Sequence, residues 1–386
     1  MQTDVAIVGA GLVGASLARA LEASGLNLAL LEASAPPART GAWDERIYAF
    51  SPASVAFLDA LGVWGALDSE RICPVRKMRI YGDNGRSRLE FSAYAAGLDA
   101  LAWIVESGEV QRALWRGIER QANLKLLFPA RPVSLEVGEH WASLAADSGE
   151  EVAARLLVGA DGAASWLRKA GGFGARSRPY RQQAVVANFA CERPHRSVAL
   201  QFFRGDGILA YLPLPGNRVS IVWSTSEPNA EELLALAPGE LAGRVAEAGR
   251  EQLGQLELIT APAAFPLALL SVNSMLRPRL ALIGDAAHVV HPLAGQGVNL
   301  GFGDARALAA TLAARRPGSD PGEWLLLRRF ERVRAEDILA MRWVTDGLQR
   351  LFGARWPGVA WLRNFGLNLT DSAPVIKASL VRHAAG

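Results

Sequence analysis

Residues 5–14 read Val-Ala-Ile-Val-Gly-Ala-Gly-Leu-Val-Gly, and this stretch decides the fold. Its first four residues form a short apolar, mostly β-branched run of the kind that builds a buried parallel strand. The remaining six match the pattern G-x-G-x-x-G. Residues 15–24 have helical character, and residues 28–31 predict a second strand that leads into Glu32. The acidic residue follows the glycines by roughly 20 positions, as a dinucleotide-binding βαβ unit requires.

Each part of this unit has a mechanical role. Gly9 permits the tight turn, Gly11 lets the backbone approach a pyrophosphate, and Gly14 lets the helix pack closely on the strand. The phosphates would meet free N–H groups at the positive end of the helix, and Glu32 would accept hydrogen bonds from ribose hydroxyls. Glycine turns without ligands are common, but the full context predicts dinucleotide binding. The pattern alone does not separate NAD from FAD.

Two distant segments repeat the design of a strand followed by a glycine-flanked aspartate. Residues 156–162 end in Gly-Ala-Asp-Gly with Asp161, and residues 280–288 contain Gly-Asp-Ala-Ala-His with Asp285. Ligands of open α/β sheets bind beyond the carboxyl ends of the strands, so three strand ends should converge on one extended cofactor. Either aspartate alone is more simply a turn or helix-cap residue. The two together favour FAD, with a carboxylate accepting from the ribitol hydroxyls.

These motifs resemble the three signatures of class A flavin monooxygenases. The second signature includes Ser165 and Arg168, and the third is Gly-Asp-Ala-Ala-His-Val-Val-His-Pro-Leu-Ala-Gly-Gln-Gly-Val-Asn-Leu at residues 284–300. Within that group the third motif is most similar to the aromatic-ring hydroxylases of ubiquinone biosynthesis, as are residues 361–367 and 381–383. The resemblance covers essentially the whole chain. The sequence departs from it at residues 302–303, which affects only the expected packing of the local helix.

The resemblance adds two cofactor contacts. Residues 44–51 are similar to the family segment whose arginine lies by the flavin, here Arg46, and Gln111 matches a glutamine at a helix start that touches FAD. By itself the sequence would make Arg46 a surface ion-pair partner and Gln111 an ordinary helical residue. The predicted cofactor-binding residues are Gly9, Gly11, Gly14, Glu32, Arg46, Gln111, Asp161, Asp285, Pro292, Gly295, Gln296, Gly297 and Asn299.

FAD motifs at both ends of the chain and the β-rich runs between them predict the domain plan: an α/β fold with a discontinuous Rossmann-like FAD-binding domain, an inserted antiparallel-sheet substrate domain and C-terminal helices. The expected FAD-binding domain comprises residues 1–75, 104–180 and 267–340. Residues 76–103 and 181–266 are expected to form the substrate-binding sheet, and residues 341–386 a C-terminal helical segment. Phe203, Tyr211 and Trp223 are candidate pocket residues, with core packing preferred for each of them. Residues 325–352 form an amphipathic helical region whose apolar face should cover the FAD-binding domain; binding to a membrane surface or a partner is the alternative.

Composition limits the remaining classes. The chain has 386 residues, 50% of them hydrophobic, and a net charge of +3 without a basic block, which argues against nucleic acid as a partner. Two cysteines without a C-x-x-C pair exclude a disulfide framework, and no metal site is expected. No apolar run reaches the length of a transmembrane helix, and the N-terminal run lacks the Lys or Arg of a signal peptide. We therefore expect a cytoplasmic protein; peripheral attachment to the inner membrane and homo-oligomer formation stay open.

The implied reaction is hydroxylation of a polyprenylated phenol in ubiquinone biosynthesis. NAD(P)H, docking transiently without a second Rossmann unit, would reduce FAD, and O2 would add to give the C4a-hydroperoxide that the electron-rich ring attacks. The flavin carries the chemistry, so the protein must bind, orient and exclude water. We interpret His288 and His291 as residues that orient their turn, and assign no catalytic base. The partners implied are the phenol, other ubiquinone-biosynthesis proteins and the membrane surface.

Four alternatives stay open at this point. Another FAD-dependent aromatic hydroxylase would share all the motifs. A flavin-dependent halogenase would need a tunnel lysine and a Trp-x-Trp-x-Ile-Pro signature, and the latter is absent. A prenyl reductase of the same superfamily would not consume O2 in proportion to NAD(P)H. A flavin-binding assembly subunit would bind FAD without substrate-stimulated NAD(P)H oxidation.

Overall fold

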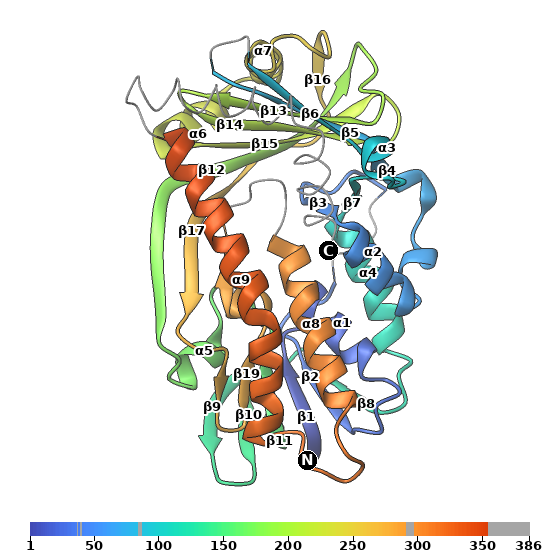
Figure 1. Cartoon of the computed structure of the whole chain (residues 1–386), viewed down its shortest axis with the longest axis vertical. Coiled ribbons are helices and arrows are strands. Elements are labelled where there is room, and N and C mark those ends of the chain that lie inside the picture. Colours follow the sequence, from blue (N-terminus) through green and yellow to red (C-terminus); the bar gives the residue numbers. More distant parts are fainter. Residues whose placement is uncertain (37, 39–40, 84–86, 291–296, 354–386) are drawn as a thin grey trace.

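The computed structural model describes residues 1–36, 38, 41–83, 87–290 and 297–353. The first sheet is mainly parallel and contains the predicted N-terminal βαβ unit (Figure 1). Its strand order is β18-β19-β11-β1-β2-β8, and the hairpin of β9 and β10 extends the edge of β11. The strands are β1 (Gln2–Val8), β2 (Leu28–Leu31), β8 (Leu124–Leu127), β9 (Pro132–Val137), β10 (Ala142–Ala146), β11 (Glu151–Gly159), β18 (Leu276–Arg277) and β19 (Leu280–Leu282).

Helices cover this parallel sheet and bury its apolar strands. The side chains of Val5 and Ile7 in β1 are fully buried, as the uninterrupted apolar run predicts. α1 packs against α4 and α8, and α8 packs against α9 (Figure 1). In α9, Leu326, Leu327 and Phe330 belong to this core, which confirms that its apolar face covers the domain. The helices are α1 (Leu12–Ala20), α2 (Pro52–Ala60), α4 (Ser107–Ile118), α5 (Trp166–Ala170), α8 (Gly297–Ala313) and α9 (Trp324–Gly353).

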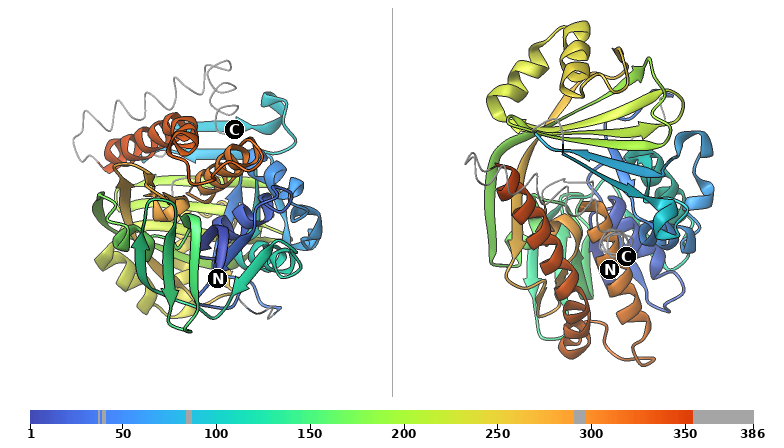
Figure 2. Two further views of the ribbon diagram at one scale, coloured as in Figure 1. Left: turned by 90° about the horizontal axis from the view of Figure 1, so that it is seen from below. Right: turned by 45° about the horizontal axis from the view of Figure 1, so that its top comes forward.

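The second sheet is mainly antiparallel and lies above the first (Figures 1 and 2). Its order is β20-β17-β12-β15-β14-β13-β5-β6, with β16 on the edge of β12, and only β13 and β5 run parallel among its described pairs. The strands are β5 (Lys77–Tyr81), β6 (Arg88–Ser92), β12 (Ala175–Cys191), β13 (Val198–Arg204), β14 (Gly207–Leu214), β15 (Arg218–Ser226), β16 (Leu256–Leu258), β17 (Ala263–Val272) and β20 (His288–Val289).

The outer face of the second sheet is covered by α6 (Glu227–Ala235) and α7 (Pro238–Ala248), at the top of Figure 2. Tyr211 and Trp223 are fully buried in the core beneath these helices, and the Tyr211 hydroxyl donates to the Val245 carbonyl at 2.6 Å. Phe203 points to the opposite face, where it packs with Ile208. Core packing is therefore the role of Tyr211 and Trp223, which face away from the inner side of the sheet, whereas Phe203 also lines a pocket at the turns of this sheet.

A small third sheet joins the other two. It consists of β3 (Ile47–Phe50), β7 (Ala102–Glu106) and β4 (Cys73–Val75), all antiparallel. Residues of β3, β4 and β7 form one apolar cluster with residues of β13 and β14. β12 and β17 each continue across the expected boundaries at residues 180/181 and 266/267, and their pairing shifts register between Pro179 and Gln182. The domain boundaries therefore stay a prediction, and residues 354–386 of the expected C-terminal segment lie outside the described residues.

In the part of the chain that the structure describes, no helix combines the length and apolarity needed to cross a bilayer.

Candidate functional site

The glycine loop after β1 is built as the sequence predicts. Gly9 has φ +101°, a conformation that side chains rarely adopt. A Cβ on Gly14 would lie 2.0 Å from the Gly9 carbonyl oxygen, so this glycine is required for close packing of α1 on the loop. Gly11 differs, because a Cβ there would meet nothing within 4 Å. Gly11 is itself the N-cap of α1, so no N-cap side chain accepts from the backbone N–H groups of the first turn.

Two side chains from elsewhere in the chain fix this loop. The Glu32 carboxylate, at the end of β2, accepts from the Ala10 backbone N–H at 2.6 Å and from the Ser34 N–H at 2.9 Å. On the other side, the buried Trp115 indole donates to the Ala10 carbonyl at 3.0 Å. Trp115 lies one turn after Gln111 in α4, so Gln111 faces the same side of the helix. Sequence reasoning missed Trp115, although its spacing from Gln111 could have indicated it.

Asp161 follows β11 and caps α5. Its carboxylate accepts from the Ser165 hydroxyl at 2.5 Å and from the backbone N–H groups of Trp166 and Leu167 at 2.6 and 3.0 Å. Asp161 therefore acts as a helix cap, which was the simpler of its two interpretations. Its role in binding the cofactor stays a prediction. Arg168 is nearly buried and donates to the Ala286 carbonyl at 2.9 Å. Arg168 thereby ties the second motif to the third.

Asp285 lies in a 3₁₀ turn shortly after β19, and its side chain is exposed to solvent. The surrounding protein desolvates this carboxyl and raises its pKa, and the charges of His288 and Arg46 oppose that shift. Desolvation and the charge of Asp285 also raise the pKa of Tyr48. Arg46, whose guanidinium lies 4.7 Å from the centroid of the Phe265 ring, is thus part of the same electrostatic group. Sequence reasoning did not identify Tyr48.

Behind Asp285 lies a buried charge network. His288 Nε2 and Asp304 Oδ2 are 2.6 Å apart, and Arg334 Nε donates to Asp304 Oδ1 at 2.8 Å. Burial disfavours the Asp304 carboxylate, but His288 and Arg334 outweigh it and lower its pKa. The Gly284 N–H also donates to Asp304, so the network fixes the turn that carries Asp285. His288 is 3% exposed and committed to this network, in agreement with its interpretation as an orienting residue.

The start of α8 completes the described part of the third motif. Asn299 accepts from the Ser51 N–H and donates to the Ala49 carbonyl, both at 2.9 Å, so it links α8 to the end of β3. Gly297 is the first residue of α8. Phe302, one of the two residues that depart from the family pattern, stacks on Phe50 with ring centroids 5.8 Å apart. The remaining predicted residues, His291, Pro292, Gly295 and Gln296, lie outside the described residues.

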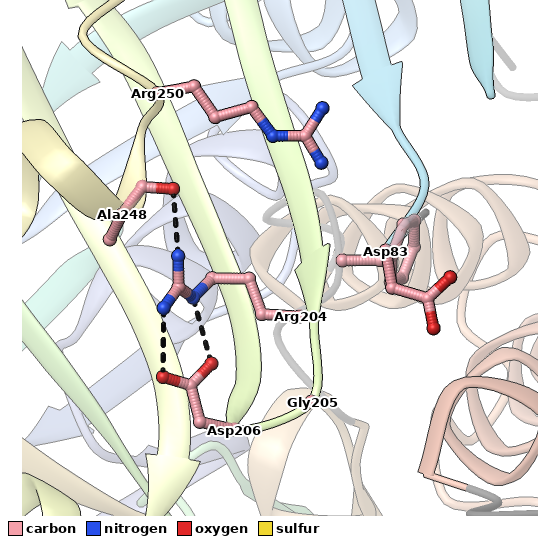
Figure 3. A pocket seen from close by; sticks show the side chains of 7 residues that line it. Asp83, Arg204, Gly205, Asp206, Ala248 and Arg250 are labelled. Atoms are coloured by element: carbon pink, nitrogen blue, oxygen red, sulfur yellow. Dashed lines mark hydrogen bonds and ion pairs between the residues drawn. The ribbon is translucent and has the colours of Figure 1, made fainter. Parts of the chain in front are cut away.

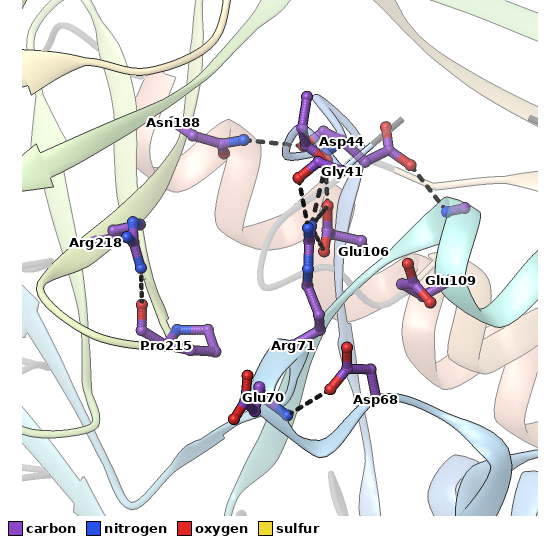
Figure 4. Close-up of polar contacts among 12 residues, drawn as sticks. Gly41, Asp44, Asp68, Glu70, Arg71, Glu106, Glu109, Asn188, Pro215 and Arg218 are labelled. Atoms are coloured by element: carbon purple, nitrogen blue, oxygen red, sulfur yellow. Dashed lines mark hydrogen bonds and ion pairs between the residues drawn. The ribbon is translucent and has the colours of Figure 1, made fainter. Parts of the chain in front are cut away.

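The loop before Arg46 is held by a polar network (Figure 4). Asp44 Oδ1 accepts from the Arg46 N–H at 2.9 Å, and Oδ2 accepts from the Gly108 N–H at 2.8 Å. The Asp44 N–H donates to Glu106, which is 2% exposed and bridged by Arg71 at 2.9 Å. A pocket of about 230 Å3 opens beside this network. None of the network residues except Arg46 was singled out from the sequence, because their contacts join segments far apart in the chain.

A larger pocket of about 380 Å3 lies elsewhere, at the turns of the second sheet (Figure 3). Its Arg204 is paired with Asp206 at 2.8 Å and donates to the Ala248 carbonyl at 3.0 Å. None of its lining residues belongs to the three motifs, so we do not place the cofactor there.

The residues at the carboxyl ends of β1, β2, β11 and β19 fit an FAD molecule. The open space at Gly11 admits a close-lying phosphate at a helix N-terminus. An exposed carboxylate at Asp285 and an exposed cation at Arg46 remain available at the same edge. A dinucleotide needs this combination of a phosphate cradle and hydroxyl acceptors.

Comparisons with known proteins agree with this geometry. A family model described as an FAD binding domain matches residues 2–336. The chain is 36% identical over 385 residues to ubiquinone hydroxylase UbiL of Rhodospirillum rubrum, covering 99% of this chain and 89% of that protein. It is 34% identical over 387 residues to 3-demethoxyubiquinol 3-hydroxylase of Escherichia coli, covering 100% and 98%.

Among solved structures, p-nitrophenol 4-monooxygenase PnpA from Pseudomonas putida DLL-E4 superposes with a TM-score of 0.80 at 17% identity, covering 100% of this chain and 99% of that one. This likeness shows the fold. The resemblance found in the sequence motifs, the FAD cofactor and the α/β fold with an added sheet are confirmed. The chain belongs to the FAD-binding-domain family of flavin-dependent monooxygenases, within the group of the ubiquinone-biosynthesis hydroxylases.

Proposed function

We propose that the protein is an FAD-dependent, NAD(P)H-using monooxygenase that hydroxylates the aromatic ring of a polyprenylated phenol on the route to ubiquinone. The observation that carries this proposal is similarity over nearly the full length to relatives named as hydroxylases of ubiquinone and demethoxyubiquinol. A likeness confined to the cofactor domain would support FAD binding alone. Here the likeness also includes the second sheet.

When bound, FAD supplies the oxygen-activating chemistry, and the chain's residues bind and orient the reactants. In this proposal the glycine loop and Glu32 would hold the adenosine half, Arg46 would lie by the flavin, Gln111 would contact FAD, and Asp285 would accept from the ribitol. Arg168 and the His288–Asp304–Arg334 network keep the two aspartate turns in place. Catalytic residues stay unassigned, since His288 is committed to Asp304.

The inner face of the second sheet, opposite α6 and α7, offers a wall for a greasy substrate. Ala210, Val222 and Val186 occupy adjacent positions across β14, β15 and β12 on this face. Leu212 and Phe265 share the face and are partly exposed, and Phe265 lies against Arg46. Apolar side chains of this kind fit a prenylated ring. We propose this face as the substrate wall, in place of Tyr211 and Trp223.

A substrate that resides in a bilayer also needs a route to the protein. The outer face of α9 exposes Leu325, Val333 and Leu339 at 68%, 65% and 53%, beside the exposed Arg329 and Arg332. Apolar and arginine side chains on one helix face are typical of binding to an anionic membrane surface. We propose such peripheral contact. It predicts that Leu325→Gln with Val333→Gln weakens flotation with anionic liposomes and leaves FAD content unchanged, whereas unchanged flotation would reject this face.

Rescue of quinone synthesis tests the proposed function and identifies the ring position. The gene is expressed in bacterial strains that each lack one ring hydroxylase, and quinones and accumulated intermediates are identified by mass spectrometry. Rescue of one strain is expected. Failure in every strain, with soluble FAD-bound protein present, would refute the quinone assignment and leave the FAD assignment standing.

Stoichiometry separates the rival reactions. A hydroxylase consumes O2 and NAD(P)H in equal amounts when the phenol is added. A prenyl reductase would consume NAD(P)H without O2, a halogenase would need halide, and an assembly subunit would show no stimulation by the phenol.

A further inference from the structure

The loop of residues 41–46, which we call the Arg46 loop, receives a partly buried hydrogen bond from the second sheet. Asn188 in β12 donates from Nδ2 to the backbone carbonyl of Asp44 at 2.9 Å (Figure 4). The two residues are 144 positions apart in the chain. Asn188 is fully buried and lies on the inner face, since Ala187 and Phe189 beside it pack into the core under α6 and α7. This bond therefore ties the proposed substrate wall to the cofactor side.

Folding stability alone does not explain why residue 188 is an asparagine. Asn188 Oδ1 is buried and has no hydrogen-bond partner among the described residues. An unpaired buried acceptor is destabilising, and an apolar residue of similar shape would avoid it. What the side chain does provide is the donor to Asp44. The residue is thus better explained by the position it gives to the Arg46 loop.

Asp44 passes this position on to two of the predicted FAD contacts, Arg46 directly and Gln111 through α4. Its Oδ1 accepts from the Arg46 N–H, and its Oδ2 accepts from the Gly108 N–H at the start of α4, the helix that contains Gln111. A displacement of Asp44 relative to the sheet would therefore move Arg46 and strain the start of α4. Rigid support of this kind is what active-site geometry requires.

We propose that Asn188 is a positioning residue that fixes Arg46 relative to the substrate wall. The inference rests on the proposed function, in which Arg46 contacts the flavin and the inner face contacts the substrate. Other contacts keep the loop folded without Asn188. The Trp43 ring contacts the guanidinium groups of Arg71 and Arg218, which lie 4.6 and 5.7 Å from its centroid. Loss of the Asn188 bond should therefore loosen the position of Arg46 and leave the fold intact.

The test compares Asn188→Leu with the matched control Ser220→Ala. Ser220 pairs directly with Asn188 in the neighbouring strand, is 1% exposed and has a hydroxyl without a partner among the described residues. Two quantities are measured: the Kd for FAD, by flavin fluorescence, and the fraction of NAD(P)H oxidation that yields hydroxylated phenol. Asn188→Leu should weaken FAD binding about fivefold, the equivalent of one net hydrogen bond, and lower the product fraction. Ser220→Ala should leave the Kd for FAD unchanged.

A double-mutant cycle with Arg46→Ala shows whether Asn188 acts through Arg46. In the Arg46→Ala background, Asn188→Leu should cause a smaller further loss of FAD affinity than it causes alone, because only its effect through α4 remains. Independent losses that multiply, or equal effects of Asn188→Leu and Ser220→Ala, would overturn the proposal. If Asn188→Leu does not fold, Asn188→Ala takes its place in the same cycle. Absence of FAD binding or hydroxylation in the unchanged protein would refute the proposed function instead.

Discussion

Substitution Asp304→Asn should cost about 3 kcal/mol of the free energy of unfolding, because it removes one charge from a fully buried network. Asp304 is 0% exposed, and its two oxygens accept from the Gly284 N–H, His288 Nε2 and Arg334 Nε at 2.9, 2.6 and 2.8 Å. An asparagine has one acceptor oxygen and one amide donor. If its oxygen replaces Oδ2, the amide faces the Arg334 donor. If its oxygen replaces Oδ1, the Gly284 N–H loses its acceptor.

Either orientation leaves a buried donor unpaired, which costs about 1–3 kcal/mol, and it leaves the Arg334 charge without its main counter-ion. Breaking a buried ion pair costs about 3–5 kcal/mol. Asp337, which is 61% exposed, remains paired with Arg334, so we expect the lower end of that range. Because the Gly284 turn carries Asp285, FAD affinity should fall as well.

Urea unfolding followed by circular dichroism, with and without added FAD, measures both effects. The matched control is Asp206→Asn, which breaks the Arg204–Asp206 pair, whose side chains are 31% and 33% exposed. A partly exposed pair of this kind contributes less than about 1 kcal/mol. A loss in Asp304→Asn no larger than in the control would refute the assignment of the network as a buried, coupled unit.

Three further predictions address the glycine loop, the acid response and the thiols. Gly11→Ala places its Cβ in open space, so the free energy of unfolding should change by less than about 0.5 kcal/mol while the Kd for FAD rises about tenfold or more. Gly14→Ala, whose Cβ would lie 2.0 Å from a carbonyl oxygen, should lose both stability and FAD affinity. Equal behaviour of the two variants would contradict a phosphate-binding role of the loop at Gly11. The pKa of Asp304 lies below its usual value, so the network stabilises the protein above the ordinary aspartate pKa of about 4 and loses that contribution as pH falls through the folded-state pKa. Asp304→Asn should therefore lose less stability than the unchanged protein as the pH falls. The same acid unfolding curve for both proteins would refute this contribution of Asp304. Burial raises the pKa of Cys73 to about 11 and of Cys191 to about 12, so a thiol reagent at pH 8 should label both only after unfolding, and rapid labelling of the folded protein would show that they are accessible.

Local sequence patterns predicted the part of the site that is local in the chain. The run from Gly9 to Glu32 fixes a strand, a turn, a helix and a second strand, and the structure brings Glu32 back to Ala10 within hydrogen-bond distance. The aspartate turns could be placed at strand ends for the same reason. Alternation in β14 and β15 could have put Tyr211 and Trp223 on one face of the sheet. It could not tell which face the helices cover, because that depends on how the two sheets pack.

The residues that the sequence did not reveal act across long separations. Asn188 meets Asp44, Arg334 meets Asp304, and Trp115 meets Ala10, each through a contact that only the folded arrangement creates. No spacing rule links such partners, since their distance in the chain is set by the elements and domains that lie between them. Their common property is burial of a polar or charged group, which requires a partner in the fold.

The central claim is that the protein inserts one oxygen atom from O2 into the ring of a prenylated phenol. The most direct measurement incubates the purified FAD-bound protein with NAD(P)H, a short-chain prenylated phenol and 18O2, and analyses the product by mass spectrometry. The expected product is hydroxylated and carries one 18O atom, and the second oxygen atom is in water. A reduced prenyl chain, a product whose new oxygen comes from water, or no product while O2 is consumed would contradict it.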